Sequence, residues 1–130
     1  MKMFEAMQSA KRSVNRQSGY RKLGSAEIAI AFSSDDAHRV VEFDAFKIGE
    51  IRTVEDPSEL RGIGVRIRMS NKQWSFYLRR RMVGKLPTLI AFNLDQPVLE
   101  FAGPFDRLHF LRVHKSIQAF VDAWARHSGP

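Results

Sequence analysis

The sequence contains no cysteine in its 130 residues. It can therefore form neither a disulfide framework nor a thiolate metal site, and it has no thiol nucleophile. Long apolar runs are also missing, because no window approaches the roughly 20 residues that a membrane-spanning helix needs. Near the N-terminus, Glu5, Gln8 and Lys11 interrupt the apolar residues. We therefore expect no secretory signal peptide and a cytoplasmic location.

Acidic residues are missing from one stretch of the chain, 61–90, which contains eight lysines and arginines. Residues 25–60 contain nine acids and three bases, whereas residues 1–24 contain six bases and one acid. The formal charge of the whole chain is +7. One interpretation is that the acidic and basic segments lie together and neutralise each other. The other is that the basic segments bind a polyanion or an acidic partner.

The motifs of common active sites are missing as well. No phosphate-binding loop and no nucleophile elbow occurs, and Gly62 and Gly64 lack the third glycine of a dinucleotide loop. Glu42 and Asp44 share a strand face, as a pair of catalytic carboxylates does, but a solvated strand face also accounts for them. The four histidines have no metal-ligand spacing. We therefore expect no enzyme, no metal site and no cofactor.

What the sequence does contain is enough apolar material for a folded core. Ten phenylalanines and two tryptophans argue against a disordered chain, and the length fits one globular domain. Apolar residues recur at helical spacing at the start of the chain and predict an amphipathic helix. They are Phe4, Met7, Ala10 and Val14. This predicts a basic N-terminal helix and linker, 1–24, followed by a main domain, 25–130.

Alternation of apolar and polar residues predicts a β-rich main domain, and its clearest example is a hairpin. Residues 65–69 and 74–78 each alternate, and polar residues 70–73 lie between them. This register buries Trp74 and Phe76 and places the arginines on the opposite, solvent-facing side. Further strands are expected within residues 27–32, 39–51, 89–94, 98–101 and 108–113.

The expected fold is α+β, with about seven antiparallel strands in a curved sheet or partly open barrel. An N-terminal helix precedes the strands, and a C-terminal helix with Ile117, Phe120 and Trp124 on one stripe caps them. This order resembles the pleckstrin-homology-like (PH-like) superfold of the bacterial type, in which such a helix plugs the barrel. The loop 33–38 contains no lysine or arginine, so the resemblance does not extend to phosphoinositide recognition. The order is also similar to the single-strand-binding fold of the PUR and Whirly type.

The basic hairpin face and the basic N-terminal helix are the candidate binding surface. Guanidinium groups bind phosphates through paired donors, and a tyrosine among them offers a stacking platform for bases. We therefore predict a non-catalytic module that binds a polyanion, nucleic acid without strong sequence preference, or else an acidic protein partner. The predicted site residues are Arg66, Arg68, Tyr77, Arg79, Arg81, Lys85, Lys11, Arg12 and Arg16.

Two other functions remain open at this point. The first is a PH-like protein–protein adapter or a subunit that assembles into a homo-oligomer. The second is a peripheral membrane module. Three arrangements of the N-terminal helix also remain open. The helix packs on the domain, binds a partner or polyanion, or lies on an anionic bilayer. No transmembrane segment is expected.

Overall fold

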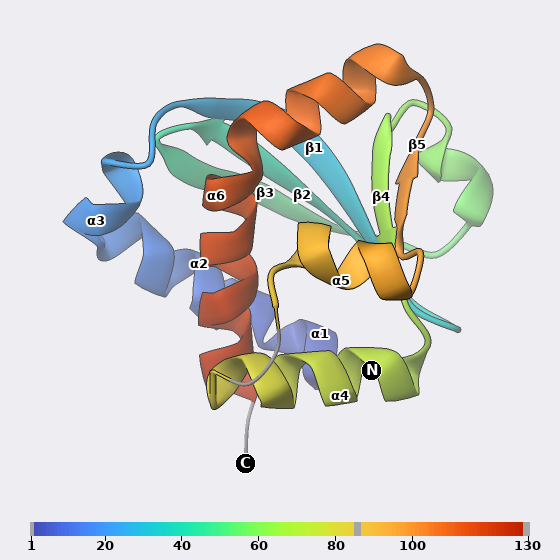
Figure 1. The fold of residues 1–130 in the computed structure, drawn as a ribbon, viewed down its shortest axis with the longest axis horizontal. Coiled ribbons are helices and arrows are strands. Elements are labelled where there is room, and N and C mark those ends of the chain that lie inside the picture. The colour runs from blue at the N-terminus through green and yellow to red at the C-terminus, as the bar shows by residue number, and fades with distance from the viewer. Residues whose placement is uncertain (1, 85–86, 129–130) are drawn as a thin grey trace.

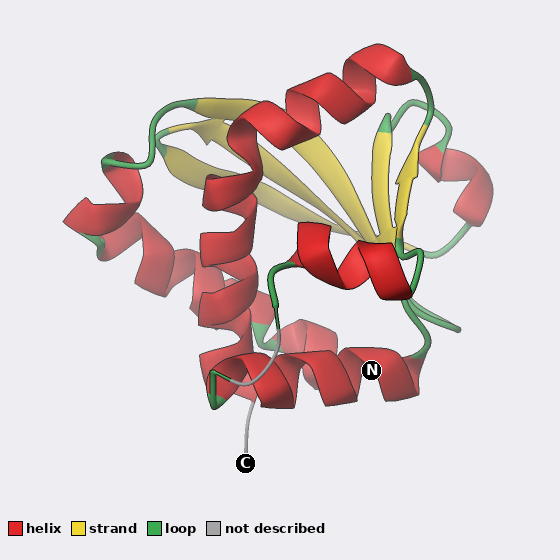
Figure 2. Ribbon diagram, in the orientation of Figure 1, coloured by secondary structure: helices red, strands yellow, loops and turns green. Residues whose placement is uncertain are grey.

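The computed structural model describes residues 2–84 and 87–128 and has helices and strands in mixed order (Figures 1 and 2). The elements are α1 (Lys2–Glu5), α2 (Met7–Arg16), α3 (Ser18–Arg21), β1 (Ala26–Ser33), β2 (His38–Ala45), β3 (Lys47–Val54), the 3-10 helix η1 (Pro57–Leu60), β4 (Val65–Arg68), α4 (Asn71–Met82), α5 (Leu89–Asp95), β5 (Leu99–Phe101) and α6 (Pro104–Ser128). The α+β class is as expected, but the strand arrangement is not.

The strands form one open sheet in the order β3-β2-β1-β4-β5. Strands β1 and β4 are parallel, and the other neighbouring pairs are antiparallel. The expected barrel of about seven antiparallel strands is therefore wrong: the sheet is mixed, has five strands and does not close. Three segments that were expected to be strands are helical instead, which removes the strands that a barrel would need.

The predicted hairpin is the most consequential error. Its first half is strand β4, but the second half lies in helix α4, which begins after Ser70. The Ser70 Oγ accepts a hydrogen bond from Gln73 N at 3.0 Å, and the Gln73 side chain accepts one from Ser70 N at 2.8 Å. This reciprocal cap satisfies two backbone donors of the first turn and stabilises the start of a helix.

Helix α4 consequently buries a different set of side chains from the one a strand would bury. Trp74, Tyr77 and Leu78 are buried at helical spacing, whereas Phe76 is 41% exposed. Trp74 fits both the strand and the helix period, so its burial was predicted correctly for the wrong element. The expected solvent-facing surface, with arginine side chains around an exposed Tyr77, does not form.

Two further segments expected to be strands are also helices. Residues 89–94 lie in α5, whose start is capped by the Thr88 hydroxyl accepting from Ala91 N. Residues 108–113 belong to the first half of α6, which continues without interruption through the predicted C-terminal helix. The predicted burial of Trp124 in that helix is confirmed.

The helices cover one face of the sheet, and the core lies between the two layers (Figure 1). Its centre is aromatic: the ring centroids of Trp74 and Trp124 are 4.9 Å apart, and Phe32 of β1 contacts both rings. The Trp74 Nε1 donates to the Ser33 carbonyl, and the Trp124 Nε1 donates to the Met3 carbonyl, each at 2.8 Å. These bonds tie α4 to the sheet and α6 to α1.

The N-terminal helices share this core. All four apolar residues of the predicted stripe, Phe4, Met7, Ala10 and Val14, are buried, and α2 packs against α6 and β3. Of the three alternatives for this segment, packing on the domain is the one observed. The sequence also predicted that the chain divides into an N-terminal segment, 1–24, and a main domain, 25–130. The shared core does not test this division, which stays a prediction.

The opposite face of the sheet is largely uncovered. Leu60 of η1 packs there on Ala31, Val40 and Val54, and these residues form a second, small apolar cluster. Charged side chains of β2 and β4 also lie on this face. Among the residues that the structure describes, no helix is long and apolar enough to cross a bilayer.

Candidate functional site

A groove of about 440 Å³ lies between α4 and α5 on the helical side of the molecule. Helix α4 and its capping residue contribute most of the wall, and α5 contributes the facing side. The lining residues are Ser70, Lys72, Gln73, Ser75, Phe76, Arg79, Phe92 and Gln96. This volume falls within the roughly 300–1,000 Å³ of ordinary ligand pockets.

Two aromatic side chains give the groove its apolar part. Phe92 of α5 is almost fully buried, and its ring centroid is 5.0 Å from that of Tyr77. Phe76 is partly exposed, and the Arg80 guanidinium lies 5.7 Å from its ring centroid. Lys72 and Arg79 also line the groove, so cationic groups stand beside an aromatic surface. This combination suits a ligand that has both an apolar and a polar part.

The separation of α4 and α5 is fixed by side-chain hydrogen bonds. The Gln73 Nε2 donates to the Gln96 Oε1 at 2.9 Å and joins the two walls across one end of the groove. Gln73 also caps α4 through its own oxygen, so both ends of its amide are used. The Tyr77 hydroxyl donates to the Pro87 carbonyl at 3.1 Å, just before α5.

A buried polar network behind the groove connects α4, α5 and α6. The Gln118 Oε1 accepts from Leu89 N at 2.8 Å, and its Nε2 donates to Asp122 Oδ1 at 3.0 Å. Asp122 in turn accepts two hydrogen bonds from Arg81, at 2.9 and 2.7 Å. These bonds raise the pKa of Arg81, and burial raises the pKa of Tyr77 to about 12. The network holds the first turn of α5 against α6.

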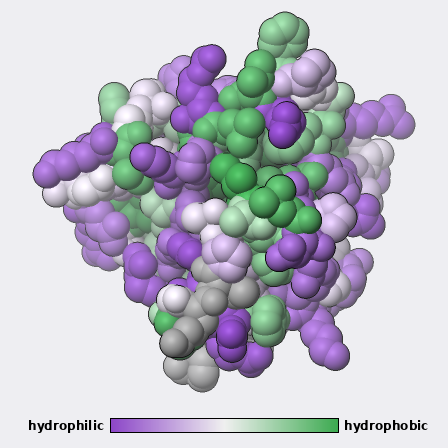
Figure 3. Space-filling model, in the orientation of Figure 1, coloured by the Kyte–Doolittle hydropathy of each residue, from purple (hydrophilic) through white to green (hydrophobic). Residues whose placement is uncertain are grey.

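Apolar side chains are also exposed beside α5. Leu94 is 83% exposed, Phe105 is 84% exposed, and Leu108 is more than half exposed. Figure 3 shows hydrophobic residues gathered over α5 and the first turns of α6 in the same view as Figure 1. Exposed apolar patches of this kind commonly mark binding surfaces. The groove therefore borders on further apolar surface.

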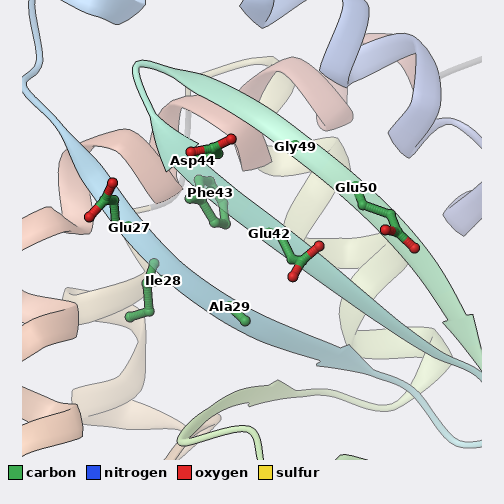
Figure 4. Close-up of a pocket in the computed structure, with 8 residues that line it drawn as sticks. All are labelled: Glu27, Ile28, Ala29, Glu42, Phe43, Asp44, Gly49 and Glu50. Atoms are coloured by element: carbon green, nitrogen blue, oxygen red, sulfur yellow. The ribbon is translucent and has the colours of Figure 1, made fainter.

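The uncovered face of the sheet carries a separate hollow of about 370 Å³, which Figure 4 shows in close-up. Glu27, Glu42, Asp44 and Glu50 line it together with small residues such as Gly49. Within residues 2–84 and 87–128, none of these four carboxylates forms an ion pair. No group of three or more potential ligands among the described residues is arranged to hold a metal ion. The hollow is thus a solvated acidic face.

The predicted site residues do not form one surface. Arg66 and Arg68 lie on β4, at the uncovered sheet face, whereas Arg79 and Arg81 lie on α4. Tyr77 is fully buried, so it offers no stacking platform. The N-terminal basic residues are on α2: Lys11, Arg12 and Arg16. Lys85 lies outside the described residues.

Sequence reasoning missed the groove because it assigned its two walls to strands. Phe76 was expected in the core of a hairpin, and Phe92 and Gln96 were not singled out. The signal that would have found α4 is the spacing of Ser70 and Gln73, a serine followed three residues later by glutamine. Thr88 gives a weaker signal of the same kind for α5.

The comparisons with known proteins bear on this fold. No protein-family model matches the sequence, and no curated protein is similar to it. Among solved structures, the chain is similar to a conserved hypothetical protein of Thermus thermophilus, a candidate sterol carrier protein. The identity is 20%, the TM-score is 0.63, and the match covers 97% of this chain and 89% of that chain. The two chains share one fold.

This likeness overturns the expected relationships. The fold is that of the candidate sterol carrier protein, a five-stranded mixed sheet with helices, so the resemblance to the PH-like superfold is wrong. The nucleic-acid hypothesis depended on a basic face of a hairpin that does not exist, and it is wrong as well. The PH-like adapter falls with the PH-like fold, whereas self-assembly is not tested. The membrane alternative relied on Phe4 and Met7 as anchors, and both side chains are buried in the core.

Proposed function

We propose that this protein binds a lipid-like amphiphile in the groove between α4 and α5 and does not catalyse a reaction on it. The observation that carries the proposal is the pairing of Phe76 and Phe92 with Lys72 and Arg79 in one groove. An alkyl or ring portion would lie on the aromatic side chains and leave water, which is favourable. A polar head would meet the cationic side chains.

The shared fold supports a ligand of this class. The structural neighbour is a candidate sterol carrier protein, and a sterol is an apolar molecule with a small polar end. At 20% identity the likeness concerns the fold, so the ligand class depends on this chain's own groove. The exposed side chains of Leu94, Phe105 and Leu108 give apolar surface beside α5 on which a longer ligand would extend.

The filled interior favours the groove over a pocket deep between helices and sheet. Trp74, Trp124 and Phe32 are fully buried and in mutual contact at the centre of the core. Protein interiors are close-packed, so a ligand at that position would have to displace these rings. Binding in the groove requires no such rearrangement.

The experiment is a fluorescence titration with a pyrene-labelled long-chain fatty acid. Wild-type protein is expected to bind the probe saturably, and Phe76→Ser should weaken binding about tenfold, because a large aromatic contact of about 1.5 kcal/mol is lost. Phe46→Ser is the matched control, since Phe46 is 49% exposed and lies in the turn between β2 and β3. It should bind like the wild type.

The outcomes separate the proposal from its competitors. Equal weakening in both variants would mean nonspecific adsorption of the probe to exposed apolar residues, and the proposal would fail. Loss of binding in Phe105→Ser, with Phe76→Ser unaffected, would place the ligand on α6 and contradict the groove. Both residues are exposed, so neither substitution is expected to disturb folding.

A further inference from the structure

Three basic side chains converge on the uncovered face of the sheet, away from the groove. Ser33, the last residue of β1, pairs with His38 of β2 on one side and with Arg68 of β4 on the other. Arg66 lies two residues before Arg68 and therefore points to the same face. The parallel ends of β1 and β4 thus place two arginines and a histidine together.

The position of the histidine ring is fixed by its neighbour. The His38 Nδ1 lies 2.8 Å from the Ser33 Oγ, and Ser33 is fully buried between the strands. The backbone of Ser33 is also held, because its carbonyl accepts hydrogen bonds from Trp74 Nε1 and Met69 N. A ring anchored through Nδ1 presents Nε2 as its remaining polar atom.

The positive charge of this cluster is poorly compensated. The Arg66 guanidinium is 3.9 Å from a Glu100 oxygen, a long and half-exposed contact, and Arg68 has no ion pair among the described residues. The pKa of His38 is lowered by partial burial and then by the charges of Arg66 and Arg68. The carboxylates nearest in sequence, Asp35 and Asp36, instead accept hydrogen bonds from Asn71. The other charged residues of the neighbouring strands β1, β2 and β3 are Glu27, Arg39, Glu42, Asp44, Lys47, Glu50 and Arg52. Glu59 lies in η1, and Arg61 follows it.

We propose that His38, Arg66 and Arg68 bind a phosphate group of a small molecule on this face. Guanidinium forks match pairs of phosphate oxygens, and the imidazole Nε2 supplies one further polar contact. The proposed phosphate site shares no residue with the groove. The phosphate proposal can therefore be refuted without refuting amphiphile binding, and the reverse also holds. A nucleic-acid strand is disfavoured, because Glu42 and Asp44 on the same face would repel its neighbouring phosphates.

The experiment follows the ring signals of all four histidines by NMR while pH is varied at constant ionic strength. With inorganic phosphate as the probe, the pKa of His38 is expected to rise by about one unit, because a bound anion favours the imidazolium. The reference signals come from α6: His109, His114 and His127. They should move little, and His38→Gln assigns the signal.

Variants decide whether the cluster is responsible. Arg68→Gln should abolish most of the shift of His38, and because Arg68 is exposed the fold should survive. Arg16→Gln, at an exposed arginine of α2, is the matched control and should leave the shift intact. Equal shifts at all four histidines, or a shift that persists in Arg68→Gln, would overturn the site.

Further probes identify the source of the phosphate group. Glycerol 3-phosphate represents a soluble ester, and phosphatidylcholine vesicles containing phosphatidic acid represent a lipid headgroup. A rise in the pKa of His38 with either probe supports phosphate recognition, and the probe that produces it identifies the kind of molecule that carries the phosphate. A single-stranded oligonucleotide is the last probe. If it alone raised the pKa of His38, and inorganic phosphate and the other two probes left that pKa unchanged, the small-molecule proposal would be refuted.

Discussion

Replacing Gln118 tests the polar network that holds α5 in place. In Gln118→Met the volume and helical propensity are nearly kept, but both polar atoms of the amide are lost. The buried Leu89 N–H then has no acceptor, and Asp122 loses one donor while it keeps Arg81. The substitution therefore isolates the contribution of hydrogen bonds from that of packing.

The expected loss of stability follows from these contacts. An unsatisfied buried donor costs about 1–3 kcal/mol, and a hydrogen bond to a charged group contributes about 1.5–3 kcal/mol. Asp122 is partly exposed and recovers some hydration, so the second value counts only in part. We expect the free energy of unfolding to fall by about 2–4 kcal/mol in all.

Urea unfolding monitored by tryptophan fluorescence measures this change, because both tryptophans are buried. Gln8→Met, at an exposed glutamine of α2, is the control and should change stability by less than about 0.5 kcal/mol. Amide exchange should also accelerate most at Leu89. A change in Gln118→Met no larger than in the control would refute the reasoning about the network.

Three further predictions concern the sheet edge, the start of α4 and the tyrosines. Asn15→Ala removes both hydrogen bonds between this amide and the Ile48 backbone and should cost about 1–3 kcal/mol in urea unfolding; an unchanged midpoint would contradict it. Ser70→Ala should cost about 1 kcal/mol and reduce the helical signal in circular dichroism, whereas wild-type values would refute the cap. The pKa of Tyr20 and of Tyr77 is raised by burial to about 12, from 10 in the unfolded chain. The contribution of the two tyrosines to stability should therefore be complete below pH 10 and be lost from there towards pH 12. Tyrosinate absorbance of the folded protein should rise at higher pH than that of the unfolded protein, and titration near pH 10 in the folded state would contradict this.

The sequence allowed some elements to be predicted because only one period fits them. Phe4, Met7, Ala10 and Val14 have helical spacing and no strand alternation, and they are indeed buried on α1 and α2. The alternation of Ile28, Ile30 and Phe32 likewise lies in β1. The segment 39–51, in which strand structure was expected, contains parts of β2 and β3 and the turn between them, where Ala45 has a positive φ of 57°.

The segment 71–82 was mispredicted because two periods fit it equally well. Trp74, Phe76 and Leu78 alternate as in a strand, while Trp74, Tyr77 and Leu78 follow a helix. Local pattern does not choose between them, and the capping hydrogen bonds at Ser70 do. Once this segment is helical, the arginines on either side of Ser70 separate onto different layers of the molecule.

The charge pattern did not have the outcome that mutual neutralisation of the two segments predicts. No ion pair among the described residues joins the acidic segment 25–60 to the basic segment 61–90. The pairs that form instead connect Arg66 with Glu100 and Arg81 with Asp122, across elements that are distant in sequence. Net charge per segment constrains solvation but does not specify which groups meet in the fold.

The groove depends on tertiary packing that sequence patterns do not encode. Phe76 and Phe92 belong to helices separated by a linker, and the Gln73–Gln96 hydrogen bond helps to hold the two walls at their spacing. Their residue types were visible in the sequence, but their common surface was not. The same is true of His38, whose arginine neighbours come from a strand that pairs in parallel with β1.

Mapping the amide chemical shifts of the folded protein on addition of monomeric oleate tests amphiphile binding most directly. The account predicts that the largest changes fall in two places, residues 72–80 of α4 and residues 92–96 at the end of α5 and its C-cap, and that Phe76→Ser removes them. Changes concentrated around Phe46 or Phe105, or spread evenly over the exposed apolar residues, would contradict it.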